Sequence, residues 1–209
     1  MSSSDTPASE KARLDPYSRL AENKDLTLQE KIKDLHTVIS AAKTGMLVTR
    51  DPNGNLHSRA MNPATPFSDT QLNLIFLANN VSSKFDEIRN DSHVNVSFCD
   101  HSSTDWASYS GRARVTQDKD LIHKHWSHFI TGYIGDLKDG VHKGDETDPR
   151  VAVIEVIPDE IRYWITKQSY ILRTVQVATS AAMGKATSPG ELRTINKEEI
   201  QLAQGLHTK

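Results

Sequence analysis

The sequence contains little cysteine, no long apolar run and no excess of charge of one sign, and each absence excludes a class of protein. Its 209 residues include one cysteine, Cys99, which excludes an internal disulfide and favours a reducing compartment. The 25 Lys and Arg residues nearly balance the 27 Asp and Glu residues, which indicates no general attraction to nucleic acid or to anionic membranes. No apolar stretch has the length of a membrane span, and the first residues lack a signal-peptide core, so we expect a cytoplasmic protein.

Several well-known enzyme motifs are also missing. The chain has no nucleophile elbow, no glycine-rich phosphate loop and no dinucleotide-binding fingerprint. Of His123, His125 and His128, only the last two share a helical face, and no carboxylate or cysteine completes a ligand set. We therefore predict no metal site, and the sequence names no catalytic residue.

The chain is long enough for one packed domain with a segment at each end. Residues 1–25 are rich in polar residues and proline and have few apolar anchors, so we predict a disordered or loosely docked tail. Residues 26–184 carry the predicted strands and form the domain. Residues 185–209 are predicted to be a C-terminal extension with a short charged helix.

Apolar periodicity predicts antiparallel strands with helices at the edges and ends. A capping box at Thr27 and Glu30 opens a helix that runs to about Lys43 and stops at Gly45. Alternation predicts strands over residues 46–50, 56–63, 71–78, 93–99, 106–116, 151–157 and 160–166, the last two being a pair or one long bent strand. Further helices are predicted over residues 82–91, 118–129, 170–183 and 195–206, and a long surface loop over 135–150.

The short connections exclude a parallel doubly wound sheet and favour a small barrel. We expect a mainly β protein with flanking helices (α+β). Gly111, in the middle of a long strand, predicts a bulge or a close approach of another backbone.

The stretch from Phe76 to Arg89 runs from a strand through a short turn into a helix. Ser82, Ser83 and Lys84 stand at the helix start, where unpaired amides and the helix dipole favour an anion such as phosphate. The alternative is an ordinary N-cap, because serine is a common N-cap residue.

A flavin mononucleotide (FMN) needs cations at its phosphate and a flat apolar slot at its ring, and the sequence offers both. Arg59 shares a strand face with Met61 and can grip phosphate with two N–H groups. Asn79 could bond the polyol or the ring edge, and the two tryptophans, Trp106 and Trp164, offer flat surfaces. The alternatives are a solvated strand face for Arg59 and core packing for each tryptophan.

Taken in order, these residues resemble a known family. The segments that carry the resemblance are Ser58-Arg-Ala-Met61, Ile75-Phe-Leu-Ala-Asn-Asn-Val-Ser-Ser-Lys84, Trp106-Ala-Ser-Tyr-Ser-Gly111 and Arg162-Tyr-Trp164. They resemble the pyridoxamine-phosphate-oxidase-like FMN-binding split barrels, within them the general stress protein branch, and especially the blue-light-inducible Bli-3-type proteins of fungi. The resemblance covers about residues 25 to 200.

The resemblance implies a six-stranded antiparallel split β-barrel that forms a homodimer, with FMN in a groove between the subunits. It implies that Arg59 and Lys84, with Ser83, hold the phosphate. The flavin ring would lie along the strand ends, and Trp164 would reach it from the partner subunit while Trp106 supports the groove. The residues implied at the ring and polyol are Ala60, Met61, Leu77, Ala78 and Asn79.

The sequence departs from the true oxidases after Trp164. There it reads Ile-Thr-Lys-Gln-Ser-Tyr-Ile-Leu-Arg and lacks the arginine-rich signature that binds pyridoxal phosphate, so vitamin B6 oxidation is not expected. Two functions stay open. One is an FMN-dependent oxidoreductase in stress or light response, with an undefined redox partner. The other is a non-catalytic flavin- or haem-binding sensor of the same fold, with His57 or His93 considered for haem.

Overall fold

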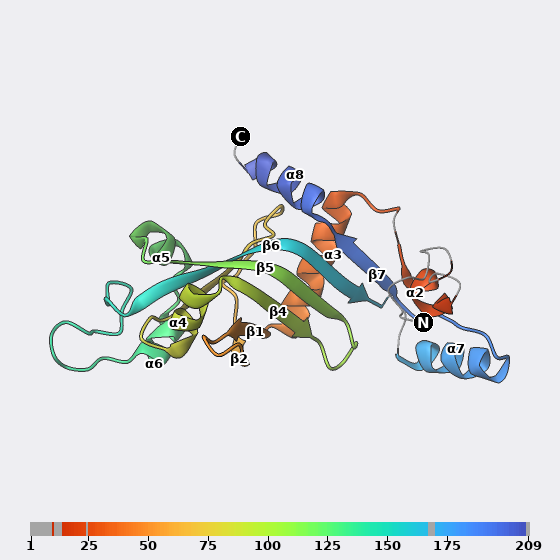
Figure 1. Cartoon of the computed structure of the whole chain (residues 1–209), viewed down its shortest axis with the longest axis horizontal. Coiled ribbons are helices and arrows are strands. Elements are labelled where there is room, and N and C mark those ends of the chain that lie inside the picture. The colour runs from red at the N-terminus through yellow and green to blue at the C-terminus, as the bar shows by residue number, and fades with distance from the viewer. Residues whose placement is uncertain (1–9, 11–13, 24, 167–169, 208–209) are drawn as a thin grey trace.

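A single antiparallel sheet with helices on its faces and ends makes up the fold (Figure 1). A computed structural model of the chain describes residues 10, 14–23, 25–166 and 170–207. Its strands are β1 (Gly45–Arg50), β2 (Leu56–Met61), β3 (Leu74–Asn79), β4 (His93–Cys99), β5 (Trp106–Thr116), β6 (Val151–Ile165) and β7 (Glu191–Ile195). Its helices are α2 (Pro16–Ala21), α3 (Leu28–Ala42), α4 (Ser83–Asn90), α5 (Lys119–His125), η2 (His128–Ile130), α6 (Thr131–Ile134), α7 (Tyr170–Ala182) and α8 (Lys197–His207).

The strand order confirms the predicted split barrel. Six strands run in the order β2-β1-β4-β5-β6-β3, β7 pairs with β6, and every pairing is antiparallel. The last two predicted strands are one strand, β6, of 15 residues. The predicted irregularity at Gly111 is confirmed, because the register shifts there and a Cβ atom would lie 2.2 Å from the carbonyl oxygen of Ile157.

Helix α3 covers one face of the sheet and closes the main core. The capping box of Thr27 and Glu30 is present, and the apolar stripe of the helix is buried against β4, β5, β6 and β7. The predicted stop at Gly45 was wrong. Lys43 takes the positive φ of 63° at the helix end, and Gly45 already belongs to β1, where a Cβ atom would meet the ring of Phe98 at 2.7 Å.

Two further predictions differ from the structure. The C-terminal segment contains strand β7 before α8, and its Arg193 is buried because it pairs with Asp34 and Glu191. Helix α5 ends at His125 rather than near residue 129, so Phe129 is 87% exposed instead of lying on an apolar helix face. Trp126 instead caps the carboxyl end of α5.

The long strand β6 spans the molecule and separates two ends (Figure 1). Helices α4, α5 and α6 lie at one end, and α2, α7 and β7 lie at the other. The predicted tail over residues 1–25 lies partly outside the described residues, while α2 within it docks on the sheet through the buried Ala21. None of the helices in the described ranges has the length and apolar character that crossing a membrane requires.

Candidate functional site

A cavity of about 790 Å³ lies at the end of the molecule formed by α4, α5 and α6. The carboxyl ends of β2 and β3 and the start of α4 form one side, and the segment from Lys124 to Tyr133 forms the other. Six of the nine predicted cofactor residues line it, namely Ala60, Met61, Leu77, Ala78, Asn79 and Lys84.

The turn into α4 differs from an ordinary N-cap. Ser82 is the N-cap residue, yet its side chain accepts no bond from the helix amides; its Oγ donates to the carbonyl oxygen of Asn79 at 2.7 Å. The ammonium group of Lys84 donates to that same Oγ. Among the described residues no acceptor is found for the backbone N–H groups of Ser83 and Lys84. The start of α4 therefore offers open donors to an anion.

Arg59 lies beside this helix start, just outside the cavity wall. Its Nη1 donates to the carbonyl oxygen of Leu47 at 3.3 Å and to Thr49 Oγ1. Burial lowers the pKa of the Lys84 ammonium group, and the neighbouring charge of Arg59 lowers it further. Two cations that oppose each other in this way favour an anion between them.

Glu87, one turn after Lys84 on α4, fixes the position of Arg59. Its carboxylate is 4% exposed and accepts from Arg59 Nη2 at 2.6 Å and from Thr49 Oγ1. The imidazole Nδ1 of His57 lies 2.8 Å from its other oxygen. Burial raises the pKa of the Glu87 carboxyl, but the bonds from its three partners outweigh burial, so the pKa lies below its ordinary value. No pattern in the sequence marked this cluster.

The opposite wall of the cavity was also missed. It is aromatic and basic, and it consists of Lys124, His125, Trp126, Ser127, Phe129, Ile130 and Tyr133. Burial lowers the pKa of the His125 imidazole, and the charge of Lys124 lowers it further, so both favour the neutral form of this ring. The signal in the sequence is the dense run of aromatic and basic residues, which falls within and just after the helix predicted over residues 118–129.

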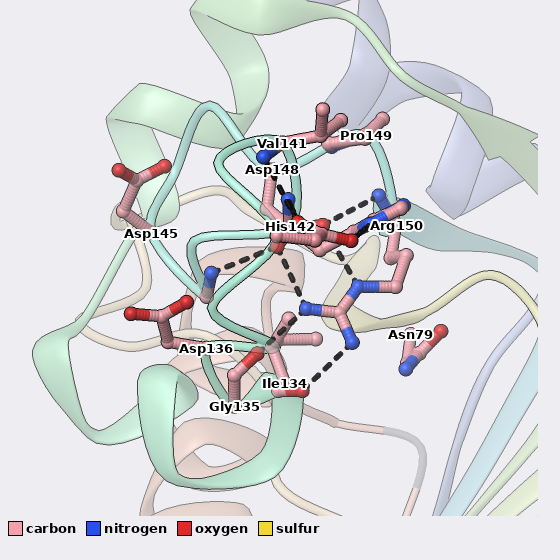
Figure 2. Close-up of polar contacts among 12 residues, drawn as sticks. Asn79, Ile134, Gly135, Asp136, Val141, His142, Asp145, Asp148, Pro149 and Arg150 are labelled. Atoms are coloured by element: carbon pink, nitrogen blue, oxygen red, sulfur yellow. Dashed lines mark hydrogen bonds and ion pairs between the residues drawn. The ribbon is translucent and has the colours of Figure 1, made fainter.

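The loop from 135 to 150 contacts the end of α6, which is part of this wall, through hydrogen bonds of Arg150 (Figure 2). Arg150 donates to the carbonyl oxygens of Ile134 at 3.2 Å and Gly135 at 2.6 Å, at the end of α6. The same guanidinium pairs at 2.8 Å with Asp148, whose carboxylate is buried and also accepts from the amide of Gly144. This pairing holds the pKa of Asp148 well below its ordinary value.

The loop also reaches the turn before α4. The Nδ2 group of Asn80 donates to the carbonyl oxygen of Pro149 at 3.0 Å, and the Asn80 amide donates to that of Arg150 at 2.8 Å. The two sides of the cavity are thus connected through one loop.

Trp164 does not join the cavity of its own chain. The strand partner of Ala78 is Ala152, and Trp164 follows Ala152 by twelve residues on β6, roughly 40 Å along an extended strand. Trp164 is the strand partner of Trp106 in the pairing of β5 with β6, and its ring stacks on that of Tyr17 of α2 with the ring centroids 5.8 Å apart. Trp164 thus lies far from the cavity of its own chain, and its predicted role remains a prediction.

The donor set fits a planar cofactor that carries a phosphate. Lys84 lines one end of the cavity, Arg59 lies just outside the wall there, and the two open amides begin α4 beside them; apolar strand ends line the cavity next to Lys84. Among the described residues no group of three His, Cys, Asp or Glu side chains is placed to hold a metal ion. Of the histidines considered for haem, His57 bonds Glu87 and His93 bonds Asp91.

Comparisons with known proteins agree with this geometry. Residues 30–188 match the family model described as pyridoxamine 5'-phosphate oxidase like. Protein bli-3 of Neurospora crassa is 36% identical over 194 residues, which cover 92% of each chain. General Stress Protein 26 of Bacillus anthracis superposes with a TM-score of 0.53 and 26% identity, over 66% of this chain and 94% of that one. These similarities confirm the resemblance that the sequence motifs indicated.

Two more distant structures share the fold. A pyridoxamine 5'-phosphate oxidase-related, FMN binding protein of Nostoc punctiforme superposes with a TM-score of 0.50 and 12% identity, over 65% of this chain and 80% of that one. A heme binding protein of Mycobacterium smegmatis gives a TM-score of 0.52 and 10% identity, over 85% of this chain and 61% of that one.

Proposed function

Because the chain belongs to the pyridoxamine 5'-phosphate oxidase-like family, we propose that it binds FMN in the cavity between β2, β3 and α5. The observation that carries the proposal is the set of open donors at the start of α4, next to two cations. The FMN-binding relative of the same fold supports it.

Each part of the cavity has a role in this proposal. Arg59, Lys84 and the amide of Ser83 bind the phosphate, and Asn79 lies where the polyol leaves it. The apolar ends of β2 and β3 orient the ring and exclude water from it. Bound FMN supplies electron- and hydride-transfer chemistry, and the protein tunes it through the groups that it places around the ring.

We propose further that the functional unit is a homodimer in which Trp164 of one protomer covers the flavin held by the other. The distance of Trp164 from its own cavity supports this arrangement, as does the exposure of Phe129 and Tyr133 at the cavity mouth, 87% and 80%. Large exposed aromatic side chains beside a pocket are typical of an interface.

The absorption spectrum of the purified full chain tests the cofactor. Flavin bands, and stoichiometric quenching of added FMN fluorescence, are the expected results. A chain that stays colourless and leaves FMN fluorescence unchanged would exclude the proposal. Reduction by NADH or NADPH with turnover on an acceptor would then establish a flavin-dependent oxidoreductase, and reduction without turnover a flavin-binding sensor.

Haem is the second candidate, and His125 favours it. This imidazole lines the cavity and accepts no hydrogen bond from the described residues, and its lowered pKa favours the neutral form, which is the form that ligates iron. The haem-binding relative shares the fold. A Soret band in place of flavin bands would select this function, and its loss in H125A would identify the ligand.

The cellular role belongs to the same proposal. A part in the stress response is supported by the name of General Stress Protein 26, and a part in the light response by the blue-light-inducible proteins that the sequence resembles. We place the protein in the cytoplasm because it has one cysteine and therefore no internal disulfide. Cell fractionation, and transcript levels after stress and after blue light, test these assignments.

A further inference from the structure

Glu87 is the centre of a buried polar cluster beneath the cavity. It lies on α4 and joins side chains from two neighbouring strands, Thr49 on β1 and both His57 and Arg59 on β2. A carboxylate that is 4% exposed is costly to remove from water unless it is paired and hydrogen-bonded. These bonds supply the pairing, and they also fix one particular orientation of Arg59.

The guanidinium group of Arg59 uses its donors unevenly. Nη1 donates to Leu47 and Thr49, and Nη2 gives one N–H to Glu87. Thr49 in turn donates to the same carboxylate oxygen of Glu87 that accepts from Nη2. Thr49 and Glu87 therefore lie together at the tip of the Arg59 side chain.

An arginine has five N–H groups. The bonds at the tip leave the Nε–H of Arg59 and the second N–H of Nη2 without an acceptor in the described part of the chain. These two N–H groups lie along one edge of the planar guanidinium group. Together they form the fork that binds a phosphate through two parallel hydrogen bonds.

We propose that Glu87 is a positioning residue that clamps the tip of Arg59 so that its free side-on fork faces the phosphate site beside Lys84. The inference rests on the proposed function, because it presupposes that Arg59 binds the FMN phosphate. Burial keeps Glu87 itself away from the cofactor, since its side chain is 6% exposed against 22% for that of Arg59, to which it is bonded.

Two other roles for Glu87 lead to different results. If its charge acted mainly by repelling the phosphate, removing that charge would tighten FMN binding. If it only held α4 against β1 and β2, its loss would weaken every flavin equally. A positioning role weakens only ligands that carry the phosphate, and only while Arg59 is present.

Titration of the full-length protein with FMN and with riboflavin, which lacks the phosphate, separates these roles. We expect E87Q to weaken FMN about 5-fold, because a released arginine must be ordered again on binding, and to leave riboflavin affinity unchanged. In the R59A background, E87Q should add nothing. Tighter FMN binding, an equal loss for riboflavin, or an undiminished effect without Arg59 would each overturn the proposal.

T49V is the second variant, because E87Q leaves Arg59 partly buried without its counter-ion and could prevent folding. Valine has nearly the same shape as threonine but neither accepts from Arg59 nor donates to Glu87. We expect a phosphate-specific loss of about 3-fold in T49V, the value for one lost contact in the clamp. If E87Q fails to fold, unchanged FMN affinity in T49V rejects the proposal.

The wild-type protein and R59A separate failure of the proposed function from failure of the role of Glu87. If the wild type binds no FMN, the proposed function fails. If the wild type binds FMN but R59A binds it as tightly, FMN binding stands, but Arg59 does not hold the phosphate and the positioning role of Glu87 is wrong. If R59A weakens FMN while E87Q and T49V bind like the wild type, the phosphate site stands and the positioning role of Glu87 is wrong.

Discussion

At the scale of single residues, the main feature of the site is that neighbouring side chains hold its two cations, Lys84 and Arg59, in fixed positions. Lys84 is tied to Ser82 and Arg59 to Glu87, so neither side chain needs to be ordered when an anion arrives. Preorganisation of this kind lowers the entropic cost of binding. Loss of either side chain should therefore remove most of the electrostatic attraction that its charge supplies to a bound phosphate.

We expect R59A and K84A each to weaken FMN binding by about 2–5 kcal/mol, or roughly 30- to several-thousand-fold, because each leaves a phosphate charge without a partner. Flavin fluorescence titration measures the change. R112A is a matched control, because Arg112 lies exposed on β5 and outside the cavity lining. Wild-type affinity in both R59A and K84A would contradict the phosphate site.

The pH dependence of FMN binding should follow Lys84. The pKa of Lys84 is lowered in the free protein, so this side chain loses its charge at a lower pH than an ordinary lysine, whose pKa is about 10.4. FMN affinity should fall as the pH rises through the pKa of Lys84. At the acid end, affinity falls as the phosphate gains a proton near pH 6. K84R should keep its affinity at alkaline pH, since arginine stays charged. An alkaline limb that is identical in K84R would assign it to another group.

At the scale of elements, the loop from 135 to 150 is ordered by one buried ion pair although it contains no helix or strand. Asp148 and Arg150 link the loop to the end of α6 and to the turn before α4. An exposed aspartate such as Asp136, which bonds only Lys138 within the loop, makes no such link.

D148N should release the loop and destabilise the protein. The amide cannot neutralise Arg150, so we expect the midpoint of thermal unfolding to fall by roughly 3–9 °C. Trypsin should cut faster at Lys138 and Lys143 within the loop. D136N is the control and should resemble the wild type in both measurements. Equal trypsin rates in D148N and D136N would show that the pair does not hold the loop.

The elements also show which features a sequence can predict. The capping box of α3 and the bulge at Gly111 were predicted correctly because their signals are local. Strand β7 was missed because its sequence, Glu-Leu-Arg-Thr-Ile, contains two charges, and one of the two carboxylates that pair with the buried Arg193 lies far away in the sequence, Asp34 on α3.

The same reasoning applies to the candidate site. The helix start at Ser83 and Lys84 follows directly from adjacent residues. The cluster around Glu87 joins residues that are 38, 30 and 28 positions apart, and nothing in the local pattern marks that carboxylate as buried. The aromatic wall depends on where α5 ends, which helical periodicity did not determine.

At the scale of the whole molecule, the two ends carry different parts of the proposed site. The cavity is lined partly by α5, and Trp164 stacks on Tyr17 of α2. Helices α5 and α2 lie at opposite ends of the molecule (Figure 1). One chain therefore supplies a phosphate site and a tryptophan that cannot meet. In the proposed homodimer each protomer completes the other.

FMN affinity should then depend on protein concentration. Below the dissociation constant of the dimer, the flavin loses the cover that the partner supplies, so we expect it to be released on dilution. Sedimentation velocity with detection at a flavin absorption band follows both events. Stoichiometric FMN on a species with the mass of one chain would contradict the shared site.

Strand β6 has a consequence for the geometry of such a pair. In the proposed homodimer, the length of β6 from Ala152, beside the cavity, to Trp164 would set how far apart the two flavins lie. Because side chains alternate along a strand, removing one residue would shorten this length and turn Trp164 to the other face, whereas removing two would shorten it and keep the face. If the proposed homodimer forms, the spacing of its two cofactors would therefore change by two residues of β6 at a time.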